Sequence, residues 1–452
     1  MMRRLVAAFL LACGSSVWAA DRPNILLLIS DDHRWDALGA AGNAAIHTPQ
    51  LDRLAAAGVY LWQATIHVPQ CSPSRASLLT GLPPHRHRWY SNQFQDPAVA
   101  APDGFNGLPL LPGLLRQRGY RTVLTGKWHL APDPGQCGFS LVRTWLPQGG
   151  AAYVDVHLAR GDSRDPQPTK GYLQQVLADD VIDFLNSPAA HQQPFFYWVA
   201  FTAPHLPYGP NPPHIQQLYL GKEPRELLPP GFPNDIPTND WRRYYEAVSF
   251  LDEQIGRILD ALDRAGLQDN TVVVFLGDNG YMMGHKGVGV QGGTGKVVPY
   301  EGSVRVPLIL RAPGIARLQG RCDAPVSSLD LPVTILTLAG MAPPHDWPGR
   351  DLLPLLRGKP NHGIDHAVCE WADEHSDRFG HLAYRLVRTP RFKLIVWKDP
   401  HRTSEFYDLA ADPLEQHNRI DDPALAGARD DLHSKLERWM QQTEDPATSW
   451  PH

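Results

Sequence analysis

An apolar run near the start of the chain constrains the fold most. Residues 24–30 read Asn-Ile-Leu-Leu-Leu-Ile-Ser and are followed at once by Asp31 and Asp32. A continuous apolar run, without the alternation of a half-exposed strand, is typical of a parallel strand buried on both faces. In open α/β sheets the chemistry lies at the carboxyl ends of such strands. The run therefore predicts a buried strand that ends at a site containing two carboxylates.

Later apolar runs repeat this pattern, and helical stretches separate them. The strand-like runs are residues 120–125, 195–201, 271–276 and 306–310. The helical stretches are residues 48–57, 110–118, 173–185, 241–265 and 331–338. Strands that alternate with helices indicate an α/β fold, in which a mainly parallel sheet is covered by helices on both faces.

The pattern changes near residue 345, where Pro and Gly clusters begin. Two alternating runs, residues 382–388 and 392–397, are separated by Thr-Pro-Arg and indicate a hairpin, and residues 425–442 read as a closing amphipathic helix. With 452 residues, 43% of them hydrophobic, the chain is long enough for one large core and a smaller lobe. We predict a main domain over residues 21–345 and a small C-terminal α+β subdomain over residues 346–452, with an antiparallel sheet and a helix.

The first twenty residues predict export. Arg3 and Arg4 precede a short apolar run and a stretch of small residues, which is the layout of a signal peptide over residues 1–20. The apolar run is too short for a stable membrane span, which takes about 20 apolar residues. Residues 10–13, Leu-Leu-Ala-Cys, leave open a lipid anchor on Cys13 as an alternative. We expect a periplasmic or secreted protein.

Charge and cysteine content narrow the class of partner. The formal net charge is −5, without long runs of one sign, which argues against a nucleic-acid partner. If Cys13 leaves with the signal and Cys71 has a separate role, Cys137, Cys322 and Cys369 allow one disulfide and one spare thiol in an oxidising compartment. Spacing does not decide which two would pair. No Cys and His spacing is typical of a structural zinc site.

Residues 71–81 read Cys-Ser-Pro-Ser-Arg-Ala-Ser-Leu-Leu-Thr-Gly. This string resembles the signature of the type I sulfatases, which begins Cys-x-Pro-x-Arg and whose cysteine is oxidised to formylglycine (3-oxoalanine) by a formylglycine-generating enzyme. The resemblance runs from residue 23 to about residue 420 and includes Glu-Phe-Tyr-Asp-Leu at residues 405–409. It implies the alkaline-phosphatase-like fold and a sulfuric ester hydrolase whose nucleophile is a modified Cys71.

The residues around Cys71 suit the chemistry of such a group. A hydrated aldehyde carries two hydroxyls on one carbon, so one can attack sulfur and the other can later expel sulfate. Pro73 would fix the backbone at the start of a helix whose N-terminus favours an anion. Arg75, one turn further along, would hold the deprotonated hydrate.

Two pairs of residues at strand ends form a hard oxygen set. Asp31 and Asp32 follow the first predicted strand, and Asp278 and Asn279 follow the strand over residues 271–276. Three carboxylates and an amide oxygen suit Ca²⁺ or Mg²⁺ rather than zinc. The sulfatases carry Asp-Asp and Asp-Asn at these places and bind calcium with them. The resemblance therefore implies one Ca²⁺ ion, held by these four residues together with the modified Cys71.

Basic residues complete the site that the resemblance implies. Lys127 and His129 lie in a Gly-Lys-Trp-His string and are similar to the family residues that bind sulfate and contact the hydrate. His205, in Thr-Ala-Pro-His, is similar to the second family histidine and is our candidate for protonating the leaving alcohol. Lys296 resembles the second sulfate-binding lysine, with His285 and Lys286 as competitors for that role.

The expected substrate is a sulfated carbohydrate such as a glycosaminoglycan. Residues 71–83 resemble the heparan N-sulfatases (sulfamidases), but Trp128 stands where those enzymes carry lysine. We therefore predict an O-sulfatase, with hydrolysis of N-sulfoglucosamine as the alternative. Rings and cations suit stacking on a sugar and pairing with its anions. The residues expected to line the mouth of the site are Trp35, His87, Arg88, Trp89, Tyr208 and His285.

Other functions stay open at this point. A phosphonate or phosphodiester hydrolase would share the fold and much of the site. A non-catalytic binding protein would keep the metal and sulfate contacts and leave Cys71 unmodified. A phosphopantetheine or nucleotide transferase of the same superfamily is disfavoured, because it would carry Ser or Thr in place of Cys71.

Overall fold

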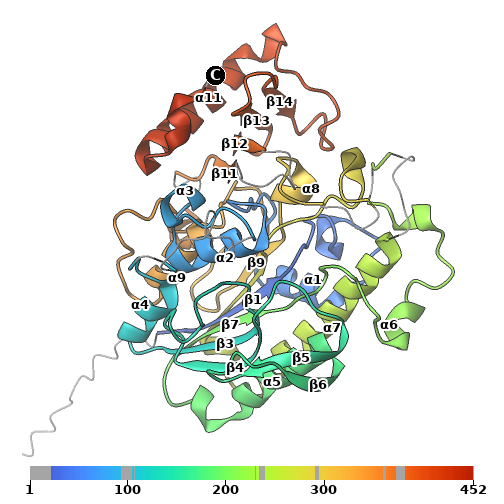
Figure 1. Cartoon of the computed structure of the whole chain (residues 1–452), viewed down its shortest axis with the longest axis vertical. Helices are drawn as coiled ribbons and strands as arrows, with labels where there is room; N and C mark the ends of the chain where they lie inside the picture. Colours follow the sequence, from blue (N-terminus) through green and yellow to red (C-terminus); the bar gives the residue numbers. More distant parts are fainter. Residues whose placement is uncertain are drawn as a thin grey trace, which may run out of the picture.

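The computed structural model describes residues 22–92, 104–105, 107–229, 231–233, 240–290, 295–359, 363–372 and 382–450. These residues form a ten-stranded sheet between layers of helices and a four-stranded sheet at one end of the molecule (Figure 1). The predicted α/β fold with a small C-terminal α+β subdomain is confirmed. The predicted signal peptide, with Cys13, lies outside the described residues. None of the helices in the described ranges is long and apolar enough to cross a membrane.

The large sheet is parallel at its centre and has antiparallel pairs on either side of that centre, although its edge strand β10 is parallel to β2. Its strands are β1 Asn24–Ser30, β2 Val59–Leu61, β3 Arg121–Lys127, β4 Leu141–Leu146, β5 Val154–Arg160, β6 Gln167–Tyr172, β7 Phe195–Ala200, β8 Thr271–Gly277, β9 Leu308–Arg311 and β10 Gly320–Cys322. They lie in the order β10-β2-β9-β8-β1-β7-β3-β4-β5-β6. The neighbours from β8 to β4 are parallel, whereas β9 is antiparallel to β8 and β5 is antiparallel to β4.

Continuous apolar runs in the sequence predicted five strands of the large sheet but not its other five strands. All five predicted runs contain strands, namely β1, β3, β7, β8 and β9. β9 is antiparallel because the described part of the β8–β9 connection contains no long crossover helix, so the chain returns along β8. The missed strands β2, β4, β5, β6 and β10 are short or carry partly exposed and polar residues. No continuous apolar run marks such strands in the sequence.

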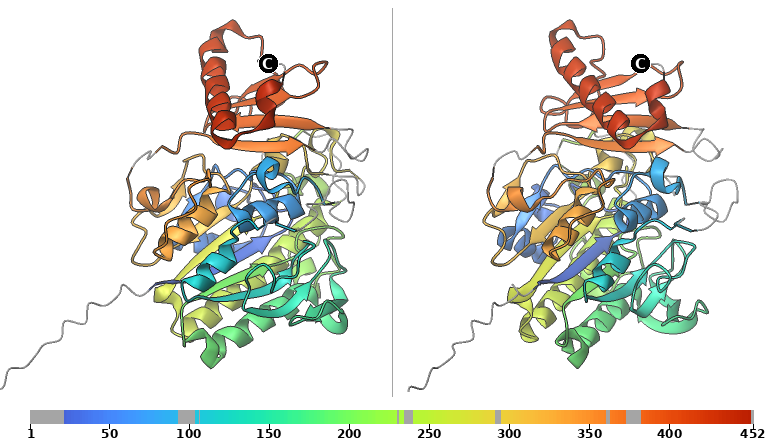
Figure 2. Two further views of the ribbon diagram at one scale, coloured as in Figure 1. Left: turned by 60° about the vertical axis from the view of Figure 1, so that its left-hand side comes forward. Right: turned by 90° about the vertical axis from the view of Figure 1, so that its left-hand side faces the viewer.

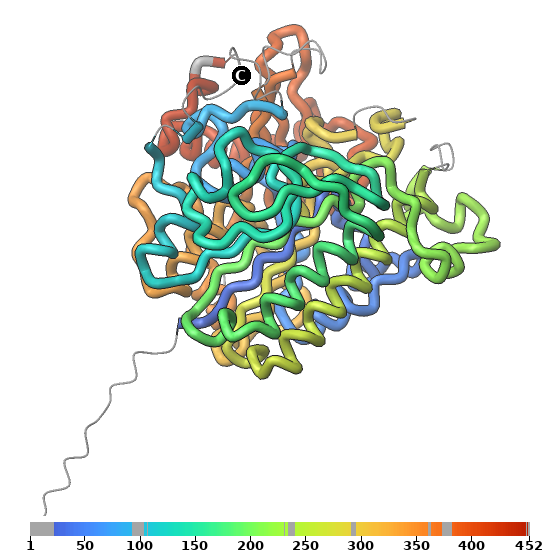
Figure 3. Tube along the Cα trace, turned by 60° about the horizontal axis from the view of Figure 1, so that its bottom comes forward, coloured from blue at the N-terminus to red at the C-terminus, as the bar shows by residue number. Residues whose placement is uncertain are grey.

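Helices cover both faces of the sheet because side chains of the central strands alternate between two cores. In β1, Ile25, Leu27 and Ile29 pack into one core, and Leu26 and Leu28 pack into the other. Figure 3 shows two long helices, α5 and α7, across one face. The helices of the main domain are α1 Pro49–Ala57, α2 Cys71–Thr80, α3 Pro84–His87, α4 Leu111–Gln117, α5 Leu173–Asn186, α6 Pro213–Gln217, α7 Trp241–Arg264, α8 Glu301–Val304, α9 Asp330–Leu338 and α10 Leu353–Leu356.

The C-terminal sheet lies between the main domain and the last helix (Figure 2). It is antiparallel, with β11 Ala367–Ala372, β12 Ala383–Arg388, β13 Phe392–Trp397 and β14 Glu405–Asp408 in that order, and the helix is α11 Ala426–Thr443. One face packs against Leu432 and Leu436 of α11, and the other contacts Val68 and Val304 of the main domain. The predicted hairpin and closing helix are both present.

The segment between the two sheets packs against the main domain. Leu352, Leu356 and Ile364 lie in one of the two cores of that domain, and the small sheet begins at Ala367. The boundary predicted at residue 345 stays a prediction.

The four described cysteines, Cys71, Cys137, Cys322 and Cys369, are all free. The disulfide expected among the last three is not formed. Cys322 ends β10 at one edge of the large sheet, whereas Cys137 precedes β4 near the other side. Cys369 lies in β11 of the smaller sheet. The three thiols belong to separate elements, and two of them fill hydrophobic cores.

A buried ionic cluster joins α3 to the C-terminal subdomain. Glu370 in β11 accepts hydrogen bonds from the backbone N–H of His85 at 3.0 Å and from its Nδ1 at 2.8 Å. Nε2 of His85 lies 3.0 Å from the carbonyl oxygen of Thr443, and Arg385 pairs with Asp445 at 2.6 Å. Because both ring nitrogens of His85 face acceptors, the protonated imidazole satisfies both. Burial acts to lower the pKa of His85, but Glu370 outweighs it and raises that pKa above 6.5.

His85→Gln should destabilise the fold more at pH 6 than at pH 9. The protonated form of His85 stabilises the fold fully below its unfolded pKa, and this contribution is lost as the pH rises through the raised folded pKa. Glu370 stays ionised throughout, because His85 and Arg385 hold its pKa well below 4.5 against the effect of burial. Hydrogen bonds to charged groups contribute about 1.5–3 kcal/mol, so we expect a loss of that size in the free energy of unfolding at pH 6 and a smaller loss at pH 9.

Guanidinium denaturation at the two pH values measures this difference. The control is His214→Gln, which removes an exposed pair with Glu253 and should cost less than about 1 kcal/mol at both pH values. Equal losses at pH 6 and pH 9 for His85→Gln would contradict the assignment of a charged pair.

Candidate active site

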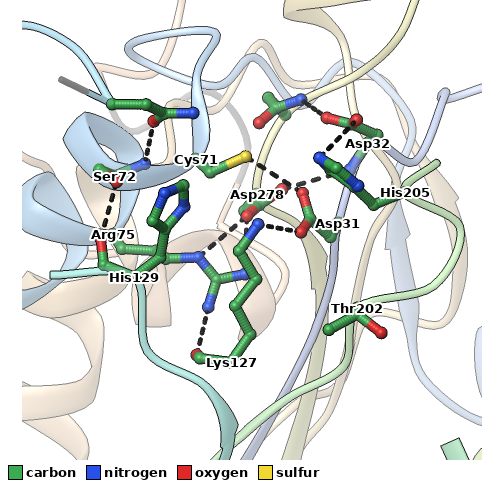
Figure 4. A network of polar contacts seen from close by, with 12 residues as sticks. Asp31, Asp32, Cys71, Ser72, Arg75, Lys127, His129, Thr202, His205 and Asp278 are labelled. Atoms are coloured by element: carbon green, nitrogen blue, oxygen red, sulfur yellow. Dashed lines mark hydrogen bonds and ion pairs between the residues drawn. The ribbon is translucent and has the colours of Figure 1, made fainter. Parts of the chain in front are cut away.

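Polar residues from neighbouring strands meet at one edge of the large sheet. The strands β8, β1, β7 and β3 are parallel neighbours, so their carboxyl ends lie at the same edge. Each strand is followed there by residues that the sequence analysis singled out. β1 leads to Asp31 and Asp32, β8 to Asp278 and Asn279, β3 to Lys127 and His129, and β7 to His205 (Figure 4).

Cys71 is the first residue of α2, whose N-terminus points at this edge. Pro73 lies in the first turn, where its missing N–H has no intrahelical acceptor to lose. Gly81 ends the helix with φ at 65°, in the left-handed region, and a Cβ there would come within 2.1 Å of the Trp347 ring. Every residue of α2 is buried. The segment is therefore both a core element and the carrier of the site.

The thiol of Cys71 lies inside the polar cluster. Its Sγ is 3.2 Å from Oδ1 of Asp31 and 3.0 Å from Nζ of Lys296. Burial, and then the charge of Asp31, raises the pKa of Cys71 to about 12. At neutral pH the group is a thiol, and the thiol is a far weaker nucleophile than the thiolate.

Three ion pairs surround the thiol. Lys127 pairs with Asp31, Lys296 pairs with Asp32 at 2.7 Å, and Arg75 pairs with Asp278 at 2.7 Å. The side chains are at most 10% exposed. Burial alone would raise the pKa of Asp31, but Lys127 and the other nearby cations hold it well below its ordinary range. The formal charges of the three pairs cancel.

The oxygen atoms beside these pairs fit a hard divalent cation. Asn279 is fully buried, and its Nδ2 donates to Oδ1 of Asp32 at 2.6 Å and to the carbonyl oxygen of Gly280 at 2.8 Å. Its Oδ1 has no hydrogen-bond partner among the described residues. Burial, and then Asp31, raises the pKa of Asp278 to about 6, so a further cation nearby would favour its ionised form. A spare amide oxygen beside three carboxylates is a donor set that Ca²⁺ prefers.

Two histidines flank the carboxylates on opposite sides (Figure 4). Nδ1 of His205 donates to the carbonyl oxygen of Leu206 at 2.8 Å, because a carbonyl can only accept. This leaves Nε2 facing the site, 3.8 Å from Oδ2 of Asp32. Burial lowers the pKa of both histidines, and Lys127 lowers that of His129 further. The His205 side chain is 25% exposed, so the site opens on its side.

Asp32 and His129 adopt unusual backbone conformations, with φ at 61° and 58°. Positive φ is uncommon for residues other than glycine, and such residues cluster at functional sites. The carbonyl oxygen of Asp32 accepts from the Tyr244 hydroxyl at 2.8 Å, and that of His129 accepts from the Ser72 hydroxyl at 2.7 Å. The supporting roles of Ser72 and Tyr244 could not be predicted from the sequence, because a side chain that holds a remote backbone carbonyl leaves no motif.

Four residues predicted to line the mouth are buried instead. His87 bonds the Ser77 hydroxyl at 2.9 Å, and Trp89 stacks on Phe105 at 5.6 Å between ring centres. Tyr208 donates to Sδ of Met283 at 3.4 Å, and the ring of His285 packs on Phe232 at 5.2 Å. All four are at most 3% exposed, so they do not contact solvent at an opening, which corrects the prediction.

The remaining predicted residues are placed as follows. Arg88 is exposed, in agreement with a surface position. Trp35 is partly exposed, and its ring lies 3.9 Å from the Arg305 guanidinium and 5.0 Å from the Trp62 ring. Lys286 points away from the site, with Nζ over the Tyr300 ring at 4.6 Å. Of the competitors for the second lysine role, the structure therefore brings only Lys296 to the thiol.

Comparisons with known proteins agree with this geometry. Residues 23–341 match the family model described as Sulfatase, and residues 291–442 match the model described as N-sulphoglucosamine sulphohydrolase, C-terminal. An ulvan-active sulfatase of Formosa agariphila is 28% identical over 463 residues, covering 98% of this chain and 87% of the relative. An N-acetylgalactosamine-6-sulfatase of Canis lupus familiaris is 33% identical over 382 residues, covering 75% of this chain and 67% of the relative.

A solved structure is similar to this chain over nearly its whole length. The protein in that structure is bound to its substrate, D-glucosamine-2-N,6-O-disulfate. The alignment covers 94% of this chain and 99% of the other chain, with a TM-score of 0.77 and 26% sequence identity. The first family model spans well over half of the chain and includes the polar cluster and α2. The chain belongs to the sulfatase family and is a sulfuric ester hydrolase of the kind that acts on sulfated carbohydrates.

Proposed function

We propose that this sulfatase removes a 6-O-sulfate from an amino sugar, using formylglycine at position 71 and a Ca²⁺ ion. The observation that carries the proposal is the contact of the buried Cys71 with Asp31 at 3.2 Å and Lys296 at 3.0 Å, beside four oxygen-bearing side chains. The unmodified thiol suits the reaction poorly, because its raised pKa keeps it protonated. A modified residue 71 would remove that obstacle.

The charge balance of the site supports this assignment. As a hydrated aldehyde, residue 71 supplies one hydroxyl to bond sulfur and a second hydroxyl to expel sulfate. The oxygens of Asp31, Asp32, Asp278 and Asn279 would hold the Ca²⁺ ion, which would supply two positive charges. Because the three ion pairs already cancel, these two charges match one negative charge on the sulfate ester and one on a deprotonated hydroxyl.

The cationic side chains divide into two roles. Lys127 and Lys296 are point charges beside residue 71, so we assign them to the sulfate oxygens. Arg75 donates to Oδ2 of Asp278 at 2.7 Å and 3.0 Å and to the carbonyl oxygen of Lys127 at 2.6 Å. Its guanidinium therefore positions Asp278 and the end of β3, in addition to adding positive charge next to the nucleophile.

We assign one histidine to the leaving alcohol and the other to the hydroxyl of residue 71. Nε2 of His205 lies on the open side, where the sugar would leave, and can give a proton to the departing alcohol. His129 is only 9% exposed and lies on the other side of the carboxylates, so it can hold the proton of the hydroxyl at residue 71.

Relatives support the choice of sugar. The canine relative is named for the 6-sulfate of N-acetylgalactosamine, and the substrate in the solved complex is a glucosamine that carries a 6-O-sulfate. The third compared protein is named an ulvan-active sulfatase, so a sulfate group of ulvan is the alternative substrate. We assign this chain to a 6-sulfated amino sugar because two of the three compared proteins share that group.

Maturation and export complete the proposal. We infer that the protein is exported and that a formylglycine-generating enzyme acts on it before it folds. Cys71 is 0% exposed and every residue of α2 is buried, so the folded chain offers the modifying enzyme no access to the thiol.

The peptide that contains Cys71 should carry formylglycine when the protein is made with a modifying enzyme. We expect a mass about 18 Da below that of the cysteine form, measured by mass spectrometry of the digested protein. Cys71→Ala should fold and lose essentially all turnover, whereas Cys322→Ala, at a partly buried thiol outside the site, should keep it. Full sulfatase activity in protein whose peptide shows only the thiol would overturn the mechanism.

Asn279→Ala should weaken calcium binding without changing the charge of the site. The variant removes the buried amide oxygen of Asn279, which lies beside the carboxylates and has no hydrogen-bond partner in the described structure. We expect the Kd for Ca²⁺ to rise by roughly tenfold or more, measured by calorimetric titration after chelation. Asn270→Ala, at an exposed asparagine just before β8 and so at the opposite end of that strand, serves as the control. Unchanged affinity in Asn279→Ala would exclude this residue as a ligand.

His205→Asn should slow hydrolysis in a way that depends on the leaving group. Asparagine can still donate to the Leu206 carbonyl but cannot protonate an alcohol. We expect kcat/KM to fall by about 10²–10⁴ for a 6-sulfated N-acetylhexosamine and much less for an aryl sulfate, whose phenolate leaves unaided. The wild type should prefer both sulfates to an aryl phosphate diester. An equal loss on sugar and aryl sulfates would show that His205 is not the acid.

A further inference from the structure

The loop that follows β4 contacts the two histidines of the site. β4 is parallel to β3, so residues 147–153 lie at the same edge of the sheet as His129. The carbonyl oxygen of Pro147 accepts from the backbone N–H of His129 at 3.2 Å. At the other end of the loop, the Tyr153 hydroxyl donates to the carbonyl oxygen of His205 at 2.7 Å. One short loop thus fixes the backbone of both residues.

Gly149 lies directly against the imidazole of His129. A Cβ at this position would come within 2.1 Å of Cε1, 2.3 Å of Nε2 and 2.7 Å of Nδ1 of that ring. At Gly150 the same Cβ would meet Cε1 of His205 at 3.5 Å, which is an ordinary van der Waals contact. Adjacent glycines therefore face the two histidines, but only Gly149 leaves no room for a methyl group.

The backbone of His129 is held in place on both sides of its Cα. His129 is 9% exposed and its backbone has φ at 58°. Its N–H is bonded to Pro147 and its carbonyl oxygen to the Ser72 hydroxyl at 2.7 Å. A side chain at Gly149 would therefore displace the imidazole itself, toward or away from residue 71.

Backbone conformation does not explain the glycines. Neither Gly149 nor Gly150 has a positive φ, so an L-residue could adopt the backbone at both positions. The contact with the His129 ring is the constraint that remains at Gly149.

We propose that Gly149 is a positioning residue, whose missing side chain sets the place of the His129 imidazole beside residue 71. The inference rests on the proposed role of His129. Reactions in enzyme sites lose about 10²-fold when a reacting group is misplaced by 1 Å.

The test compares alanine at three glycines in the formylglycine-containing holoenzyme. Gly149→Ala should lower kcat on an aryl sulfate by about 10²-fold and leave KM within a few fold, because the lysines that hold sulfate are untouched. Gly150→Ala, next to it on the same loop, should change kcat far less. Gly427→Ala, in α11 with nothing within 4 Å of its Cβ, should have no effect.

A double-mutant cycle with His129→Ala separates positioning from a general structural effect. In the His129→Ala background, Gly149→Ala should add less than about twofold, because the ring with which it collides is gone. An unchanged kcat in Gly149→Ala, or the same loss with and without the His129 ring, would overturn the proposal. If His129→Ala alone kept full activity, the proposed role of His129 would have failed, and the cycle would show that separately.

Discussion

The pairing of three buried carboxylates with three buried cations at one sheet edge is the interaction on which the rest of the structure depends. An isolated ion in a protein interior costs several kcal/mol, so Asp31, Asp32 and Asp278 can be buried only if cations reach them. Those cations come from β3, α2 and the segment before α8, which lie far apart in the sequence. The central parallel strands are what bring these segments to a common edge.

The zero net formal charge of the three ion pairs also affects which ligands the site can bind. A neutral cluster has no surplus charge with which to hold an anion, so in the proposed mechanism a divalent ion at the free oxygens and an anionic ester at the lysines would complement each other. Binding of the metal would then favour binding of the substrate, and the reverse. The position of Cys71 at a helix N-terminus suits the same proposal, since the helix dipole adds positive potential at that end without adding a titratable group.

Stability and function share the same elements. α2 is fully buried and carries Cys71 and Arg75, so the residues that build the core also orient the chemistry. The strained backbones of Asp32 and His129 are held by hydroxyls from α7 and α2. The C-terminal sheet packs on Val68, three residues before Cys71, which ties the small subdomain to the geometry of the site.

The sequence by itself determined the buried strands, most of the helices and the chemical groups of the site, because continuous apolar runs and the string over residues 71–81 are local signals. Tertiary structure decided the antiparallel return of β9, the burial of His87 and Trp89, and the contact of Gly149 with His129. Each of these depends on which remote segment lies opposite. A strand with mixed polarity, a ring that fills a core and a glycine that makes room for a histidine look like ordinary residues until the chain has folded around them.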